Sequence, residues 1–534
     1  MKFISLIIFT YFYLSIENEI NHIFNESKKS FNESLYFTTW ATALYEIGRP
    51  EIDVELDFTN KTLRQIVHIS ASGNYIRLKL SNRIGKTNLE IKEASIADSL
   101  SQGSGEIDLK TLKTLNFNGE KNIIISPGEE IYSDTIFYPL KTLSEISISI
   151  YLGKIPKNLT GHLKSRTFSF IEEGNKIYNQ KISKINKFPH WYFISSIEVN
   201  SNPIKKTIVC FGDSITDGTG TTNDRQNRWP DLLSTKLNLN KNTYNFAVIN
   251  KGIGGTSLTT EGIERYSYDV LEIKGISHII MLYGVNDINA LNLNSSDVID
   301  TYKKVIKTAH NNNIFIYAGT IMPYGNYFLW TEQKEKYRKE VNFWIKNTKK
   351  EEGGFDGFFD FDEFVKDPKN PEKMLSKYDN GDGIHPSPEG YRRMVQAIEN
   401  VDIFNEEANF DKDLNELQLI DKIGVKFNLG FNLEKNEEII VNIKGHCNDS
   451  FGFRVLTCNK EGIKTSEYYY SGKIMKGKFQ INNIELKVYD MSNYIIIKRP
   501  LSTINIDNIT LEYIKVLTEN NKKIFILPGD ALYL

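Results

Sequence analysis

The chain has 534 residues, a formal net charge of −2, 40% hydrophobic residues and 25% charged residues. This length suggests about three domains of roughly 100–200 residues each, and the composition is typical of a soluble globular protein. Because there is no basic excess to attract phosphates, nucleic acid and anionic lipid are not expected partners.

The N-terminus carries an apolar run from Phe3 to Ile16 behind the single basic residue Lys2. The run is too short to span a bilayer comfortably and is typical of the hydrophobic part of a secretory signal peptide. We therefore predict a signal peptide over residues 1–17 and a secreted protein without stable membrane insertion. No Ala-x-Ala-like cleavage site follows, so an uncleaved anchor or a disordered leader is the alternative.

Glycosylation signals and cysteines bear on the same prediction. Seven Asn-x-Ser/Thr sequons agree with secretion and a glycoprotein, although an Asn-rich chain forms some by chance. They begin at Asn25, Asn32, Asn60, Asn158, Asn294, Asn448 and Asn508. Cys447 and Cys458 could bridge neighbouring strands in an oxidising compartment, and Cys210 lies in an apolar run that favours a core position. No Cys/His cluster has zinc-ligand spacing.

Residues 36–200 are rich in predicted strands. Ile76–Leu80 and Ile146–Leu152 alternate with period two, and turn signals such as Pro127-Gly128 separate such segments. This pattern predicts an antiparallel β-sandwich.

Residues 205–402 alternate between apolar strands and helices. The predicted strands are Thr207–Phe211, Tyr244–Ile249, Ile279–Tyr283, Ile314–Gly319 and Gly357–Phe361. Between the third and fourth, apolar residues from Val298 to Ala309 recur at helical spacing. Repeated strand–helix units predict a parallel sheet with helices on both faces, whose ligands bind at the carboxyl ends of the strands.

Residues 410–534 return to short strands, such as Glu438–Ile443 and Tyr494–Lys498, which predict a second β-sandwich. Three consecutive tyrosines, Tyr468 to Tyr470, could stack on sugar rings, although alternate tyrosines in a strand are more simply explained as core and surface residues.

A serine follows the first strand of the α/β region, in Gly212-Asp213-Ser214. The carboxyl end of a first parallel strand suits a nucleophile, although a serine there is also a common helix N-cap. A serine needs an adjacent base, and Asp382-Gly383-Ile384-His385 provides one. At this spacing a turn can bring the carboxylate to Nδ1 of His385 and leave Nε2 for the serine proton.

Two further strand ends carry potential hydrogen-bond donors. Gly254 and Gly255 follow the second strand, and Gly284-Val285-Asn286-Asp287 follows the third. A glycine N–H and an asparagine amide are donors suited to an oxyanion hole, whereas the simpler explanation is turn residues. Four modest signals at four strand ends are together less expected by chance than any one of them.

These four blocks together resemble the SGNH (GDSL-type) hydrolases over residues 205–402. The resemblance implies a flavodoxin-like α/β/α sandwich and no metal or cofactor. It also implies Ser214 as nucleophile, His385 as base, Asp382 as its orienting partner, and an oxyanion hole formed by the Ser214 N–H, the Gly255 N–H and the Asn286 side chain. Asp213 is expected to support the turn, and a shift from Gly255 to Gly254 stays open.

The flanking regions suggest a substrate class. Trp40-Ala41-Thr42 and residues 67–82 resemble the N-terminal β-domain of a secreted subgroup that includes carbohydrate esterases, and Ile504–Thr510 is weakly similar to carbohydrate-binding β-sandwiches. We therefore expect a serine esterase for short acyl groups, chiefly O-acetyl, on plant polysaccharide. The alternatives are a lipase or phospholipase, and a catalytically weak carbohydrate-binding protein.

Overall fold

The computed structural model describes residues 36–47, 58–182, 187–200, 206–239, 243 and 246–399, and the backbone of strands between 424 and 533. The chain divides into two compact units, residues 1–402 and 403–534. The predicted signal peptide and the sequons at Asn25, Asn32, Asn448 and Asn508 lie outside the described residues. Among the helices that are described, none is long and apolar enough to cross a membrane.

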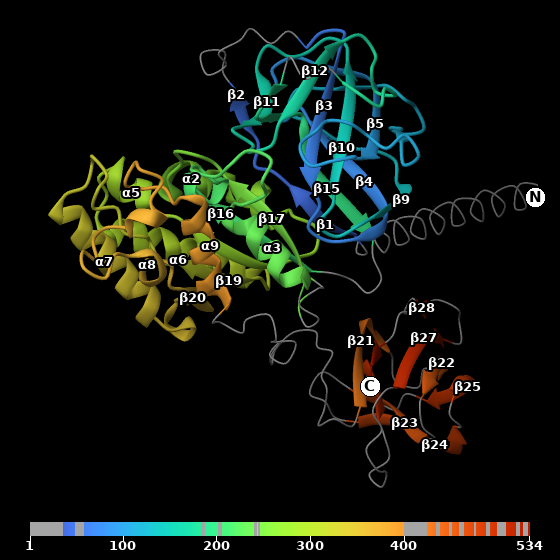
Figure 1. Cartoon of the computed structure of the whole chain (residues 1–534). Helices are drawn as coiled ribbons and strands as arrows, with labels where there is room; N and C mark the ends of the chain where they lie inside the picture. The colour runs from blue at the N-terminus through green and yellow to red at the C-terminus, as the bar shows by residue number, and fades with distance from the viewer. Residues whose placement is uncertain are drawn as a thin grey trace, which may run out of the picture. The chain divides into compact units, whose positions relative to one another are not determined.

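Residues 36–200 form antiparallel sheets, drawn in blue to green in Figure 1. One sheet has the order β1 (Tyr36–Ala41), β15 (Ile194–Asn200), β4 (Gly73–Ser81) and β8 (Glu130–Tyr132), with β9 (Ile136–Leu140) also pairing with β4. A second has the order β13 (Lys187–Phe188), β12 (Ser169–Glu173), β3 (Lys61–His68), β10 (Glu145–Leu152), β5 (Leu89–Asp98) and β6 (Lys113–Leu115), with β7 (Ile123–Ile125) also on β5. A small third sheet joins β14 (His190–Tyr192), β11 (Leu159–Leu163) and β2 (Tyr45–Ile47).

The predicted alternation in β10 is present, but both of its faces are buried. Ile148 lies in the hydrophobic core that joins the two larger sheets. On the opposite face Ser149 accepts a hydrogen bond of 2.8 Å from Nε of the buried Arg64. A serine can therefore occupy an interior position because its hydroxyl finds a partner there.

Residues 206–399 form the predicted α/β/α sandwich. Its parallel sheet has the order β17 (Phe246–Gly252), β16 (Lys206–Gly212), β18 (Ile276–Leu282), β19 (Phe315–Gly319) and β20 (Gly357–Phe359). Numbered along the chain, this order is 2-1-3-4-5, the flavodoxin-like order, and its ligand site is expected where β16 separates β17 from β18.

Two groups of helices pack around this sheet (Figure 1). One group contains α3 (Trp229–Leu239), α8 (Phe361–Val365) and α9 (Pro388–Glu399). The other contains η2 (Leu258–Gly262), α4 (Ile263–Tyr266), η3 (Ser267–Leu271), α5 (Val285–Asn289), α6 (Ser295–Asn311) and α7 (Glu332–Asn347). Shorter turns are α2 (Ser214–Asp217), η4 (Lys350–Glu352) and η5 (Ser376–Tyr378). The apolar stripe predicted for the 298–309 segment is buried in α6.

The second parallel strand extends further than predicted. Residues 250–252 were expected to follow it, yet β17 continues through Gly252. Lys251 is tolerated in this buried strand because its Nζ donates to the Thr42 carbonyl oxygen at 2.7 Å and to Asp269 at 3.2 Å. Conversely, β20 ends at Phe359, before the predicted Phe361, because Asp360 caps α8.

The strand-rich region and the α/β region share one compact unit. The Thr38 N–H donates to the Lys274 carbonyl oxygen at 2.9 Å, and the Thr207 hydroxyl donates to the Thr38 carbonyl oxygen at 3.0 Å. Ala247 of β17 also belongs to the hydrophobic core of the strand-rich region. The two regions are therefore packed against each other rather than joined by a free linker.

The second unit contains two antiparallel sheets. One has the order β21 (Gly424–Leu433), β26 (Ser492–Lys498), β23 (Phe451–Cys458) and β24 (Lys464–Ile474). The other has the order β25 (Gly477–Lys487), β22 (Glu438–Cys447), β27 (Ile509–Thr518) and β28 (Ile524–Ile526), with β29 (Leu532–Tyr533) also on β27. The side chains of Cys447, Cys458 and the three tyrosines, and residues 504–508, lie outside the described residues.

Candidate functional site

Ser214 lies at the carboxyl end of β16, at the start of α2. The turn is tight, because a Cβ on Gly212 would lie 2.1 Å from the Thr216 hydroxyl oxygen. Asp213 caps the helix by accepting a hydrogen bond from the Ile215 N–H at 2.9 Å, as expected of a residue that supports the turn. Ser214 is 9% exposed and faces a surface groove.

His385 approaches Ser214 from the loop that precedes α9. Its Nε2 lies 2.8 Å from the Ser214 Oγ, and its Nδ1 lies 2.7 Å from Oδ2 of Asp382. A carboxylate at Nδ1 favours the tautomer whose proton is on Nδ1, which leaves Nε2 as an acceptor for the serine proton. Ser214, His385 and Asp382 thus form a continuous chain of two hydrogen bonds.

The Asp382 carboxylate is held by its own loop. Its Oδ1 accepts hydrogen bonds from the Ile384 N–H at 3.0 Å and the His385 N–H at 2.9 Å. Partial burial raises the pKa of Asp382, but hydrogen bonds from His385 and Ile384 outweigh that effect and bring the pKa below its usual value. The group facing the imidazole is therefore an anion at neutral pH.

The predicted donors line the same groove. Gly254, Gly255 and Asn286 all lie along it with Ser214. Gly255 has a φ of +81°, which favours glycine, and a Cβ there would meet nothing within 4 Å. A Cβ on Gly254 would lie 3.8 Å from the Ser214 Cβ, so a side chain at Gly254 would contact Ser214. The shift from Gly255 to Gly254 considered from the sequence therefore stays open.

Asn286 and Asp287 connect the glycine turn to the start of α5. The Asn286 amide donates to the Thr256 carbonyl oxygen at 2.9 Å. Asp287 accepts from the Leu258 N–H at 3.0 Å and the Thr259 N–H at 2.9 Å. Because an amide has two N–H groups, one hydrogen of Asn286 is left over after the bond to Thr256.

The groove has a volume of about 900 Å³. From the α/β region it is lined by Ser214, Gly254, Gly255, Asn286, Tyr327 and His385, among others. From the strand-rich region it is lined by Leu44, Tyr45, Glu46, Ile84, Leu163 and Lys164. Sequence analysis predicted the first group in part and missed the second. The second group has no motif or spacing that marks it, because its residues converge only through tertiary packing.

The groove has a lining of mixed polarity, in which apolar side chains such as Leu44, Ile84 and Leu163 lie beside charged ones. Its lining includes Glu46, Lys164, Asp217, Glu261, Glu264 and Arg265. Charged groups that line a site are costly to cover with hydrocarbon.

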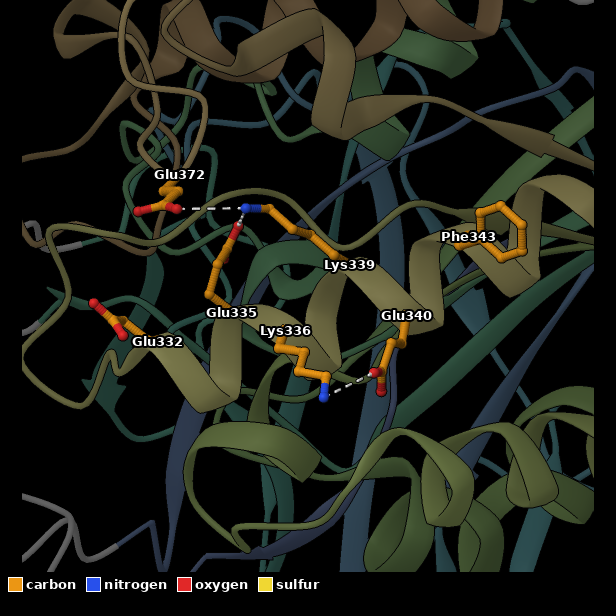
Figure 2. Close-up of a pocket in the computed structure, with 7 residues that line it drawn as sticks. All are labelled: Glu332, Glu335, Lys336, Lys339, Glu340, Phe343 and Glu372. Carbon is orange, nitrogen blue, oxygen red and sulfur yellow. Dashed lines mark hydrogen bonds and ion pairs between the residues drawn. The ribbon is translucent and has the colours of Figure 1, made fainter.

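A second depression, of about 580 Å³, lies along α7 (Figure 2). Both of its lysines pair with carboxylates: Lys339 lies 3.3 Å from Glu335 and 3.4 Å from Glu372, and Lys336 lies 3.9 Å from Glu340. The depression is lined by neither serine nor histidine. Its chemistry is that of a solvated helix face.

Groups of three or more histidine, cysteine, aspartate or glutamate side chains that could hold a metal ion are absent from the described part of the chain. Cys210, the free cysteine identified there, is buried, and burial raises the pKa of its thiol.

Residues 208–398 match the family model described as GDSL-like Lipase/Acylhydrolase. This part of the chain is a GDSL-type acylhydrolase domain. The acylhydrolase domain spans β16 to α9, so the strand-rich region and the C-terminal unit lie outside the match.

Solved structures of low similarity accompany this match. A member of the lipolytic protein G-D-S-L family from Veillonella parvula is 22% identical over 37% of this chain and 97% of its own, with a TM-score of 0.28. A GDSL-like lipase from Bacteroides thetaiotaomicron is 20% identical over 36% of this chain and 86% of its own, with a TM-score of 0.29. An acetyl xylan esterase from Geobacillus stearothermophilus is 18% identical over 36% of this chain and 93% of its own, with a TM-score of 0.29. No curated protein matches the chain.

Proposed function

We propose that the acylhydrolase domain is a serine esterase that removes short acyl groups, chiefly acetyl, from a carbohydrate outside the cell. The observation that carries this proposal is the pair of hydrogen bonds from Ser214 Oγ to His385 Nε2 at 2.8 Å and from His385 Nδ1 to Asp382 at 2.7 Å. This arrangement matches the geometry that nucleophilic catalysis by serine requires.

The reaction would proceed through an acyl-enzyme. His385 takes the Ser214 proton as Oγ attacks the ester carbonyl carbon, and the carbonyl oxygen becomes the oxyanion of a tetrahedral intermediate. The Ser214 N–H, a glycine N–H and the Asn286 amide stabilise that oxyanion. His385 then returns the proton to the leaving alcohol, and water releases the acyl group by the same two steps.

The substrate class rests on the groove. Its lining includes charged groups that are costly to cover with the hydrocarbon of a long acyl chain, and its volume of about 900 Å³ exceeds the space that an acetyl group needs. A short acyl group on a larger hydroxyl-rich alcohol satisfies both conditions, and a polysaccharide provides such an alcohol. The C-terminal sheets are consistent with a glycan-binding accessory unit.

The decisive experiment compares the wild type with Ser214→Ala on p-nitrophenyl esters of increasing chain length and on a panel of acetylated glycans. We expect acetate release from at least one glycan, a preference for short chains, and turnover by Ser214→Ala at the uncatalysed background. A preference for long-chain esters would replace the proposal with a lipase. Glycan binding without any hydrolysis would replace it with a binding protein.

A further inference from the structure

His162, in the strand-rich region, contacts the turn that carries Ser214. Its side chain is 3% exposed, and its Nε2 lies 2.9 Å from Oδ1 of Asp217. Asp217 is the last residue of α2, the short helix that begins at Ser214. This contact links β11 directly to the nucleophile turn, although the family match begins only at residue 208.

The other ring nitrogen of His162 also faces an acceptor. Nδ1 lies 2.8 Å from the Ala43 carbonyl oxygen, which can only accept a hydrogen bond. Nε2 faces a carboxylate, which accepts when it is ionised. The His162 ring therefore bridges the Ala43 carbonyl group and the Asp217 side chain.

A second cation of the strand-rich region lies close to the same carboxylate. Arg166 has Nη2 3.6 Å from Oδ2 of Asp217 and donates from the same atom to the Thr219 hydroxyl oxygen at 3.0 Å. Within the turn, the Thr219 N–H donates to the Ser214 carbonyl oxygen at 2.9 Å. Two residues that follow Ser214 in the turn, Asp217 and Thr219, are therefore contacted by side chains of the strand-rich region.

Asp217 also borders the predicted oxyanion side of the site. A Cβ on Gly254 would lie 3.6 Å from Oδ2 of Asp217 and 3.8 Å from the Ser214 Cβ. A Cβ on Gly252 would lie 2.2 Å from the Asp217 N. Asp217 is thus packed against both the nucleophile turn and the glycine turn, so a displacement of its side chain would disturb the two together.

We propose that His162 is a positioning residue of the esterase site, which fixes Ser214 by holding Asp217 from the neighbouring region. This inference rests on the proposed function, because its kinetic test measures esterase activity. His162 is not part of the groove lining, so it acts through Asp217 and not by touching substrate. A nucleophile displaced by about 1 Å can lose on the order of 100-fold in rate.

The test compares two substitutions of His162 whose side-chain amides differ in length. In His162→Gln the amide nitrogen can stand near the position of Nε2 and keep a donor to Asp217. In His162→Asn it can stand near the position of Nδ1 and keep only the donor to Ala43. His310→Gln is the matched control, since His310 also pairs with a carboxylate, Asp356, at 2.9 Å, on α6 and away from the groove.

With p-nitrophenyl acetate we expect kcat of His162→Asn to fall about 10- to 100-fold with KM changed less than about twofold. We expect His162→Gln to recover most of the loss and His310→Gln to match the wild type. Equal kcat in the wild type and His162→Asn, or equal losses in the Asn and Gln variants, would overturn the inference. A wild type without esterase activity would instead refute the proposed function.

Hydrogen exchange gives a readout that needs no activity. The N–H groups of Asp217, Gly218 and Thr219 donate to the carbonyl oxygens of Asp213 and Ser214. We expect these amides to exchange at least about tenfold faster in His162→Asn than in His162→Gln, with thermal unfolding checked to confirm that each variant is folded. Unchanged exchange in both variants would show that His162 does not hold the turn.

Discussion

The strand-rich region and the α/β region meet at one groove but contribute to it differently. The α/β region provides a short turn, Gly212 to Gly218, which directly follows the parallel strand β16 and contains α2. The strand-rich region provides isolated side chains from β2, β11 and the segment after β4, brought together only by its fold. The proposed catalytic residues thus lie in short contiguous motifs. The opposite wall of the groove, in contrast, depends on the folding of the whole strand-rich region.

This contrast predicts that changes to the site residues of the α/β region lower the rate, and that changes to the hydrophobic core of the strand-rich region lower stability. The largest effect is expected from Asp382→Asn, because an amide at Nδ1 no longer enforces the tautomer that leaves Nε2 basic. We expect kcat to fall about 10⁴-fold with an unchanged midpoint of thermal unfolding. A loss below tenfold would mean that Asp382 does not orient His385.

Asn286→Ala is expected to have the next largest effect on rate. Removing one donor to an oxyanion costs about 10²- to 10³-fold in kcat, or about 2.7–4 kcal/mol of transition-state stabilisation. Steady-state kinetics on p-nitrophenyl acetate would measure this. If KM rises while kcat stays unchanged, Asn286 binds substrate and is not an oxyanion donor.

Ile148→Ala tests the other side of the comparison. Ile148 is completely buried on β10, so its truncation should lower the free energy of unfolding by about 2–5 kcal/mol, and Ile148→Val by about 0.5–1.5 kcal/mol. Denaturant unfolding measures the loss, and kcat at a temperature where the variant stays folded should remain near that of the wild type. A large kcat loss in the folded variant would show that the sandwich core tunes catalysis directly.

Asp213→Asn is expected to have the smallest effect, visible in its dependence on pH. Burial raises the pKa of Asp213 to about 7, against about 3.9 for an unfolded chain. The neutral acid therefore stabilises the fold fully below about pH 4, and this stabilisation is lost as the pH rises to about 7. Asparagine does not titrate, so the variant should gain unfolding free energy relative to the wild type between pH 5 and pH 8.

Denaturant unfolding of Asp213→Asn at both pH values measures this gain. Asp300→Asn, a change at an exposed carboxylate of α6, is the control. The same difference from the wild type at pH 5 and pH 8 would show that Asp213 is ionised in the folded protein throughout this range.

Sequence analysis predicted those features of the fold that are determined by local sequence patterns. The alternation of strands and helices indicated the parallel sheet, and the blocks around Ser214, Asn286 and His385 are brought together at its carboxyl edge because successive parallel strands end there. Roles assigned to these residues remain predictions, and secretion does too.

What sequence analysis missed depends on distant contacts. The predicted second strand ended at Ile249, yet Lys251 is buried in β17 because Asp269 and the Thr42 carbonyl oxygen compensate its ammonium group. Tyr45 and His162 carry no local signal of function, since the groove and Asp217 reach them only through packing of two regions. The two residues of each of these contacts are far apart in the sequence, so no short segment contains both.

The pairing of β1 with β15 has a consequence for engineering. Tyr36 is opposite Asn200, so the strand-rich region begins and ends on adjacent strands. Such a segment could be exchanged as a cassette between related enzymes with two nearby splice points. A graft would transfer one wall of the groove with it, together with the His162 side chain that contacts Asp217.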